Sequence, residues 1–443
     1  MLFYLMVFLL PFFAVSPWQK LFGVPVGFIY SGVVMLTLIG WLWEHRFRGL
    51  GRRIFGTPLM VGLLTFLLIN LVSILLTGSY QKENLVRFLY LAFSISVFWL
   101  TTNAVQDRDT LFKALNLFII GSFLASLYGI YETGGFLLGF DTGQEITWTV
   151  PRLYGTATEP QVFGNLLVAA ITLAAGLFLV RGNSESHRYG VFLIFMILAM
   201  VMTFSAGGWV GVIIAVGLLL LVYKWLSLKR VFALLLIIGV VGSGVTAIDK
   251  YLYPGYLQGF PSLFVKFTDQ SSQEAQGTHK LSAISREDRV WFRAAAWKMF
   301  EDHPVLGVGT GNFGYLYNQY RPGDAPEVDF VAKAHNQYLE ILAETGVIGF
   351  GIFLVVVVQL IMVVWRGLLA RDDRLLKMAT WALLASLVGL GVHGYAFGIL
   401  VHNYIWVILG LTCAAAKLPL AEGEGYSFEN RYSYRLVNPD GRS

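Results

Sequence analysis

Long apolar stretches alternate with short charged loops along most of the chain. A helix needs roughly 20 apolar residues to cross a hydrocarbon core about 30 Å thick. About twelve stretches approach this length, and we predict one transmembrane helix for each. They are 2–16, 21–43, 58–77, 86–102, 111–132, 160–180, 190–204, 209–225, 231–248, 345–365, 378–395 and 399–416.

The composition agrees with this pattern. Hydrophobic residues make up 56% of the chain and charged residues 13%, and the mean hydropathy is +0.65. Such a chain cannot be solvated as a soluble globule, so we predict an all-α polytopic membrane protein. The net charge of +5 is explained by cytoplasmic loops that face anionic lipid. We therefore expect membrane lipids, and no nucleic acid, as partners.

Lysine and arginine gather in alternate loops, which predicts the orientation in the membrane. Basic clusters occur at 46–53, 108–113, 181–188, 224–230 and 366–377 and in the tail after 416. The short loops between them carry only Lys20, Lys82, Arg87 and Arg152. Both termini are therefore expected in the cytoplasm.

This topology divides the chain into four parts. We predict about nine transmembrane helices in 1–248, one large extracytoplasmic loop in 249–344, about three helices in 345–416, and a cytoplasmic tail in 417–443. The loop is much longer than a simple helix connection. Its residues 281–303 have a helical pattern with Ser285 as N-cap, and 333–344 form a second helical stretch that runs into the helix at 345–365.

Two familiar cofactor signals fail in this sequence. The stretch GTGNFG (309–314) satisfies GxGxxG, but no predicted strand precedes it and no βαβ unit surrounds it. We interpret it as a tight turn in which glycine permits positive φ. The single cysteine, Cys413, lies in the last predicted helix, and no Cys/His pair has metal-ligand spacing. We expect no metal, no cofactor and no structural disulfide.

Three arginines mark the helix predicted in the outer loop. Arg286, Arg289 and Arg293 are three and four residues apart, which places them on one face. One interpretation is a solvated face partly neutralised by Glu287 and Asp288. The other is an anion site, because guanidinium groups bind phosphate oxygens with bidentate geometry and stay charged.

His335 stands directly ahead of a membrane helix, in AHNQYLEILAETG (334–346). A neutral imidazole can take a proton from a hydroxyl, and a carboxylate such as Glu340 or Glu344 would raise its basicity. The other interpretation is a histidine that only forms hydrogen bonds at the helix boundary. Arg152, in another outer loop, has the same two interpretations, as a ligand of an anion and as an interface anchor.

Two stretches resemble a known family. RVWFRAAAWKMFEDHPVLGVGTGNFGYL (289–316) and AHNQYLEILAETGVIGFGIFL (334–354) are similar to the signature region of the O-antigen ligase and polymerase family, the WaaL-like and Wzy-like membrane glycosyltransferases. The family pattern has an arginine that opens a short helix, a turn with Pro and two glycines, and a histidine before a membrane helix.

The resemblance implies a GT-C-like architecture. It also implies metal-independent glycan transfer from an undecaprenyl-diphosphate carrier, on the outer face of a bacterial cytoplasmic membrane. In this reading His335 activates the acceptor hydroxyl and Arg289 stabilises the diphosphate; both are catalytic. Arg152, Arg286, Arg293, Arg321, Asn336, Tyr338 and Glu159 are the implied substrate-binding residues. At Ala206, in TFSAGGWVG (203–211), many relatives have arginine.

The acceptor separates two functions. A polymerase extends another lipid-linked repeat, whereas a ligase transfers the glycan to lipid A-core, or to a protein in related enzymes. The stretch TATEPQVFGNLL (156–167) resembles a pattern of polysaccharide polymerases, so we place polymerase first and ligase second. A transporter of lipid-linked glycans is a third possibility, but transporters usually show an internal repeat and polar residues at mid-membrane, and neither is visible in this sequence.

Overall fold

The computed structural model is helical in the residues that it describes, apart from a short antiparallel ribbon. The described residues are 1–13, 20–21, 24–45, 57–77, 82–140, 142, 151–181, 183–221, 228–247, 250, 286–370 and 373–418. The ribbon pairs β1 (Lys20–Leu21) with β2 (Val24–Pro25). Most of the first third of the predicted outer loop and nearly all of the predicted tail lie outside the described residues.

Each predicted apolar stretch overlaps one helix. These helices are α1 (Leu2–Phe13), α2 (Val26–Glu44), α4 (Pro58–Thr77), α5 (Lys82–Ala104), α6 (Arg108–Leu137), α7 (Pro160–Val180), α8 (Asn183–Met202), α9 (Ala206–Leu220), α10 (Leu228–Ala247), α14 (Gln337–Leu369), α15 (Arg374–Gly394) and α16 (Asn403–Lys417). Two further helices, α12 (Arg286–Asp302) and α13 (Phe313–Tyr320), belong to the predicted outer loop. The helix predicted at 281–303 is thus confirmed from Arg286 to Asp302, and its predicted N-cap Ser285 lies outside the described residues.

Eight of these helices are long and apolar enough to cross a membrane: α2, α4, α5, α6, α7, α8, α14 and α15. Helices α1, α9 and α16 are apolar but shorter. The prediction of a multi-pass helical membrane protein is therefore confirmed. The number of twelve crossings and the GT-C-like architecture stay predictions, as do the domain bounds.

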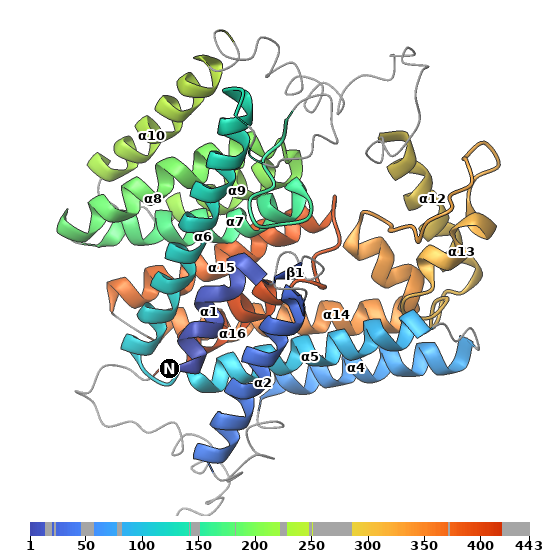
Figure 1. Ribbon diagram of the computed structural model, residues 1–443. Coiled ribbons are helices and arrows are strands. Elements are labelled where there is room, and N and C mark those ends of the chain that lie inside the picture. The colour runs from blue at the N-terminus through green and yellow to red at the C-terminus, as the bar shows by residue number, and fades with distance from the viewer. Residues whose placement is uncertain are drawn as a thin grey trace, which may run out of the picture.

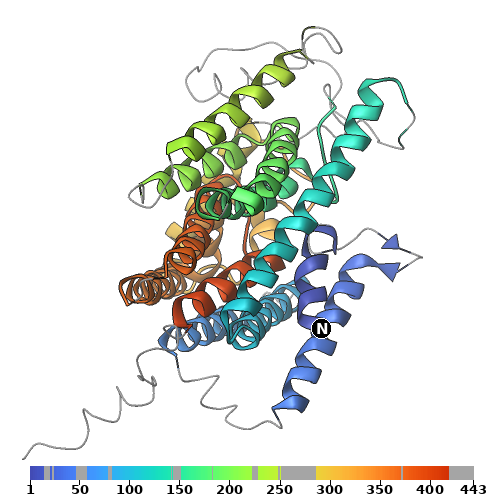
Figure 2. The same cartoon turned by 90° about the vertical axis from the view of Figure 1, so that its left-hand side faces the viewer.

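Helix α7 lies at the centre of the bundle. It is largely apolar and buried along nearly its whole length, as expected for a helix surrounded by other helices. Helices α8, α9 and α15 pack around it, while α10 lies against α8 at the edge (Figure 2). Of the eight helices long enough to cross a membrane, α2 and α14 are the least buried.

Small residues let α15 approach α7 and α9 closely. A Cβ atom on Gly211 of α9 would lie 2.7 Å from the carbonyl oxygen of Gly389 on α15, and one on Gly176 of α7 would lie 2.8 Å from Ala382 Cβ. Contacts of this kind drive helix association where the surroundings are as apolar as the side chains. They fix the C-terminal end of α15, where His393 is located.

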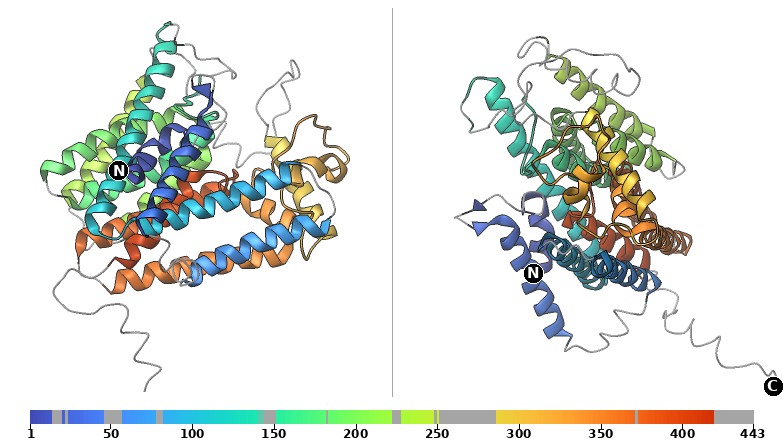
Figure 3. Two further views of the ribbon diagram at one scale, coloured as in Figure 1. Left: turned by 60° about the horizontal axis from the view of Figure 1, so that its bottom comes forward. Right: turned by 90° about the vertical axis from the view of Figure 1, so that its right-hand side faces the viewer.

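Helices α12 and α13 form a separate small unit at one end of α14 (Figure 1). Its apolar core is built from Phe292, Ala295, Ala296, Met299, Val308, Phe313, Tyr317, Ala332, Ala334 and Ala343. Helices α4 and α5 run beside α14 and reach the same unit (Figure 3). Two transmembrane helices and α14 therefore support the segment that carries both signature stretches.

Candidate active site

The two signature stretches interlock through their backbones. Helix α14 is broken at Gly346, where φ is 62° and ψ is −166°, so nearby backbone groups lose their helical partners. The carbonyls of Ala343 and Glu344 accept hydrogen bonds from Val308 and Gly309, at 2.9 and 3.0 Å. The Val347 amide in turn donates to the Pro304 carbonyl at 2.8 Å.

The glycine turn is confirmed as a turn. Gly307, Gly309 and Gly311 have φ values of 68°, 97° and 86°, which residues with a Cβ atom rarely adopt. Space is equally restrictive, because a Cβ on Gly307 would lie 2.3 Å from the carbonyl carbon of Glu344. These glycines are therefore required for the close contact between the turn and α14.

We expect Gly346→Ala to prevent correct folding of this region. The φ/ψ region of Gly346 is essentially restricted to glycine, and a Cβ there would lie 2.3 Å from the Val305 carbonyl oxygen. At Gly351, also on α14, a Cβ would meet no atom within 4 Å, so Gly351→Ala is the matched control. Membrane yield and thermal unfolding of the two variants test this; equal stability would contradict the described kink.

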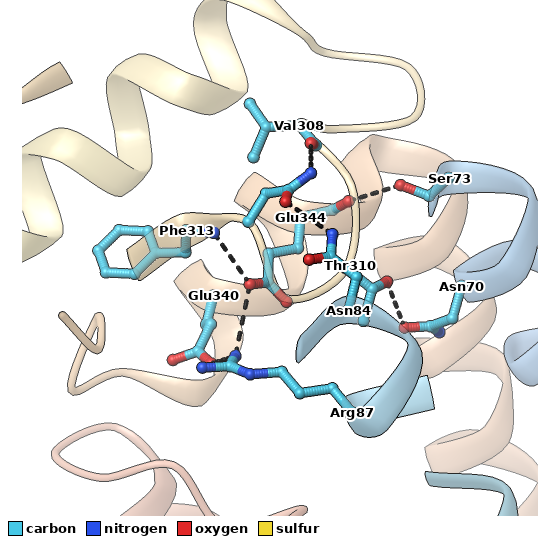
Figure 4. Close-up of polar contacts among 10 residues, drawn as sticks. Asn70, Ser73, Asn84, Arg87, Val308, Thr310, Phe313, Glu340 and Glu344 are labelled. Carbon is cyan, nitrogen blue, oxygen red and sulfur yellow. Dashed lines mark hydrogen bonds and ion pairs between the residues drawn. The ribbon is translucent and has the colours of Figure 1, made fainter. Parts of the chain in front are cut away.

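Arg87 on α5 neutralises the two glutamates of the second stretch. Its guanidinium lies 3.3 Å from Glu340 and 3.6 Å from Glu344, and the buried Glu344 carboxylate also accepts the Phe313 amide hydrogen at 3.2 Å (Figure 4). This differs from the expectation that Glu340 or Glu344 raises the basicity of His335. The carboxylates instead join α5, α13 and α14.

Three further polar side chains of α4 and α5 hold the turn. The Ser73 hydroxyl lies 2.7 Å from the Glu344 carbonyl oxygen. Asn70 accepts a hydrogen bond from Thr310 at 2.7 Å, and Asn84 donates to Asn312 at 2.6 Å (Figure 4). Helices α4 and α5 therefore bind one side of the turn. The candidate site is formed by other elements, α12 and the start of α14.

His335 lies at the centre of the candidate site. It has a positive φ of 48°, is 6% exposed, and stacks on Phe292 with ring centroids 6.0 Å apart. Neither ring nitrogen has a hydrogen-bond partner within the described residues. A buried imidazole with two unsatisfied nitrogens is costly, which is typical of a group that binds a ligand.

The surroundings of His335 are cationic. Burial, followed by the charges of Arg289, Lys333 and Arg293, lowers the pKa of His335 to about 3. The prediction that carboxylates are the charged neighbours of His335 is therefore wrong, because the charged groups that act on it are positive. The ring is neutral at physiological pH and able to accept a proton, although its basicity is low while the site holds no anion.

The residues after His335 hold it in place. Asn336 is the N-cap of α14, and its side chain accepts the Tyr338 and Leu339 amide hydrogens at 3.0 and 3.2 Å. Gln337 accepts the Ile399 amide hydrogen at 2.7 Å. The Tyr338 hydroxyl donates to the Gly391 carbonyl at 2.6 Å. Asn336 and Tyr338, predicted to bind substrate, thus have clear structural partners, and a substrate role for them stays a prediction.

The arginines of α12 face the loop between α15 and α16. Arg293 donates to the Tyr395 carbonyl at 3.0 Å and lies over the Tyr395 ring, 4.7 Å from its centroid. The positive charge of Arg289 lowers the pKa of His335. Arg286 is the first residue of α12. The structure therefore brings Arg289 and Arg293 together with His335.

The other predicted ligands have contacts elsewhere. Arg152 donates to the Thr203 carbonyl from Nε at 2.9 Å and from Nη2 at 2.8 Å, which ties its loop to the turn between α8 and α9. Arg321 pairs with Glu327 at 2.8 Å and donates to the Ala325 carbonyl. Glu159 is an exposed N-cap residue of α7 without a side-chain capping bond. No described contact joins these three to His335.

Sequence reasoning missed a second polar group beside the site. His393 contacts Asn165 of α7, and the Tyr404 hydroxyl donates to the Asn165 side-chain carbonyl. His393, Phe397, His402 and Tyr404 form a continuous ring stack. The signal in the sequence was a polar residue inside each of two apolar stretches: Asn165 in 160–180 and His393 in 378–395.

Comparisons with known proteins agree with the signature stretches. The family model described as O-antigen ligase matches residues 191–354, which include Arg289, Arg293 and His335. An uncharacterized protein of Haemophilus influenzae is 22% identical over 200 residues, 42% of this chain and 46% of that protein. The teichuronic acid biosynthesis protein TuaE of Bacillus subtilis is 30% identical over 124 residues, 28% of this chain and 25% of TuaE.

The aligned parts thus span less than half of either relative. The family match covers α8 to the first part of α14, the segment in which the glycine turn, the α12 arginines and His335 occur. The resemblance predicted from the sequence is confirmed, because residues 191–354 match the family model described as O-antigen ligase.

Proposed function

We propose that the protein is a membrane glycosyltransferase that moves a glycan from a lipid diphosphate donor to an acceptor hydroxyl. The observation that carries this proposal is the buried, neutral His335, with both ring nitrogens unpaired, beside Arg289 and Arg293. Such a site suits two ligands: a hydroxyl group that loses its proton to the imidazole, and a diphosphate anion that binds the guanidinium groups. The family match supports an enzyme of polysaccharide biosynthesis.

The proposed step uses each group once. The acceptor hydroxyl gives its proton to a ring nitrogen of His335 while its oxygen bonds to the anomeric carbon of the donor glycan. The bond from that carbon to the diphosphate oxygen breaks, and its electron pair stays on the diphosphate. Arg289 and Arg293 stabilise this developing charge. The proton later leaves His335 for water. This chain's residues need no metal or cofactor in the scheme.

Donor binding should also activate His335. In the free site the cations oppose protonation of the ring, and a diphosphate placed among them offsets that effect. The enzyme would then carry a competent base only when the donor is present.

The pH profile tests this coupling. In the free protein the pKa of His335 is lowered to about 3, so kcat/KM should show no loss from its protonation between about pH 8 and 5. The bound diphosphate raises the pKa, so kcat should fall at a higher pH than kcat/KM as the solution is acidified. The pH dependence of the rate at saturating donor gives kcat, and at low donor concentration it gives kcat/KM. A fall of kcat/KM at the ordinary histidine pKa would contradict the cationic surroundings of His335.

We place the polymerase function first. It is supported by the polymerase-like stretch around Glu159 and by the similarity to a protein named for teichuronic acid biosynthesis. Ligase is the second candidate, because the matching family model is described as O-antigen ligase. The donor is proposed to be an undecaprenyl-diphosphate-linked oligosaccharide, with the site on the outer face of the bacterial cytoplasmic membrane and both termini in the cytoplasm.

The acceptor experiment separates these candidates. Purified protein in nanodiscs is given a lipid-diphosphate-linked repeat unit alone, or together with lipid A-core. A ladder of products from the donor alone supports a polymerase, and transfer only in the presence of lipid A-core supports a ligase. The absence of transfer under both conditions would contradict the proposed enzymatic activity and would favour the transporter function instead.

A further inference from the structure

A second histidine lies beside the proposed site with its ring held in one orientation. His393, near the C-terminal end of α15, is 1% exposed. Its Nδ1 atom is 2.7 Å from the amide nitrogen of Asn165 on α7. The Tyr404 hydroxyl donates to the carbonyl oxygen of the same amide. Three helices thus fix one imidazole.

These contacts determine where the proton of His393 resides. An amide nitrogen only donates hydrogen bonds, so Nδ1 of His393 is the acceptor and, in the neutral ring, Nε2 carries the hydrogen. The Nε2 atom has no hydrogen-bond partner within the described residues. The ring therefore presents one N–H group, at Nε2, that makes no hydrogen bond within the described residues.

The donor faces the turn that begins α9. A Cβ atom on Gly207 would lie 3.0 Å from His393 Nε2 and 2.5 Å from its Cδ2, so only glycine leaves room for the ring at this place. Gly207 is in the first turn of α9, where the Ser205 side chain caps the Gly208 amide at 3.4 Å. Ala206 beside it offers no polar side chain. His393 Nε2 therefore lies against the first turn of α9.

The same ring is connected to the first site. The Tyr338 hydroxyl donates to the Gly391 carbonyl at 2.6 Å, which joins the start of α14 to the end of α15. Two hydrogen bonds hold the segment that follows His393 against the elements carrying the other site residues: Arg293 donates to the Tyr395 carbonyl, and Gln337 accepts from Ile399. The end of α15 that carries His393 is therefore held against α12 and the start of α14, the elements next to Arg289 and His335.

We propose that His393 binds a diphosphate oxygen of the donor through Nε2–H, with its tautomer set by Asn165. This inference rests on the proposed function and gives the two histidines different roles. His335 takes the proton from the acceptor, while His393 donates a hydrogen bond to the leaving group. Because the diphosphate gains negative charge as its bond to the sugar breaks, this hydrogen bond strengthens in the transition state.

Two substitutions at His393 separate this role from packing. Glutamine places an amide N–H near the position of Nε2, whereas phenylalanine keeps the ring and its stack on Phe397 but has no donor. We expect His393→Phe to lower kcat about 100-fold with little change in KM, and His393→Gln to recover about tenfold of that loss. His303→Phe is the matched control, because His303 is an exposed histidine of the outer unit.

The proposal is contradicted if His393→Phe keeps the wild-type kcat, or if glutamine and phenylalanine are equally impaired. A binding measurement keeps the test separate from the proposed function. If the wild type transfers no glycan from any donor, the proposed function fails, and undecaprenyl diphosphate without sugar is then titrated into each variant in nanodiscs. Weaker binding to His393→Phe than to His393→Gln and wild type supports the anion role; equal binding to all three overturns it.

Discussion

Replacing His335 with asparagine is expected to lower the rate of glycan transfer by about 100- to 10,000-fold, the range typical for loss of a general base. Asparagine adopts positive φ more readily than most residues, so the backbone at φ 48° is retained. Its amide does not take up a proton at neutral pH. Thermal unfolding of this variant should match that of the wild type, and turnover with saturating donor is the measurement.

Two further variants test whether the loss of transfer is specific to the His335 imidazole. His303→Asn removes an exposed histidine whose ring contacts Tyr320, and it should keep full activity. His335→Ala should be as inactive as His335→Asn but less stable, because alanine is strained at this φ. Activity near the wild-type level in either His335 variant would remove His335 from the mechanism.

Replacing Arg289 with glutamine is expected to lower kcat by roughly 100- to 1,000-fold, the usual cost of losing one donor to a developing anion. Arg289→Lys should recover only part of this, because an ammonium group lacks the bidentate geometry of guanidinium. Lys298→Gln is the matched control, since Lys298 lies on the same helix and is exposed. A second effect is expected at His335: with one cation fewer, its pKa moves upward from about 3.

A loss much smaller than tenfold in Arg289→Gln would argue against its place in the site. The two effects are separable by pH. If Arg289 only influenced His335, the variant would shift the acid limb of kcat and keep its plateau. We expect the plateau itself to fall, because the leaving diphosphate loses a stabilising charge.

The sequence predicted the helices well and the contacts between them poorly. The apolar stretches coincide with helices because each must be apolar to cross a membrane, which is a local property. The glycine turn was also predictable, because its chemistry depends on φ at single residues. The break at Gly346 and the hydrogen bond from the Val308 amide to the Ala343 carbonyl were not, since they depend on two segments more than 30 residues apart meeting in space.

The candidate site was predictable only in part. Arg289 and His335 were indicated by the signature stretches, and the structure places them together with Arg293. Glu340 and Glu344 are near His335 in sequence, but they pair with Arg87 from α5, a partner that no local pattern reveals. His393 was missed because it lies within an apolar stretch, where one polar residue barely changes the hydropathy.

The central claim is that His335 and the α12 arginines form a glycan-transfer site. The most direct test measures glycan transfer and release of lipid diphosphate by purified protein in nanodiscs, with a lipid-diphosphate-linked repeat unit as donor. Wild type and His303→Asn should release diphosphate in step with glycan transfer, while His335→Asn should bind the donor and transfer almost nothing. Equal transfer by His335→Asn and wild type would contradict the account.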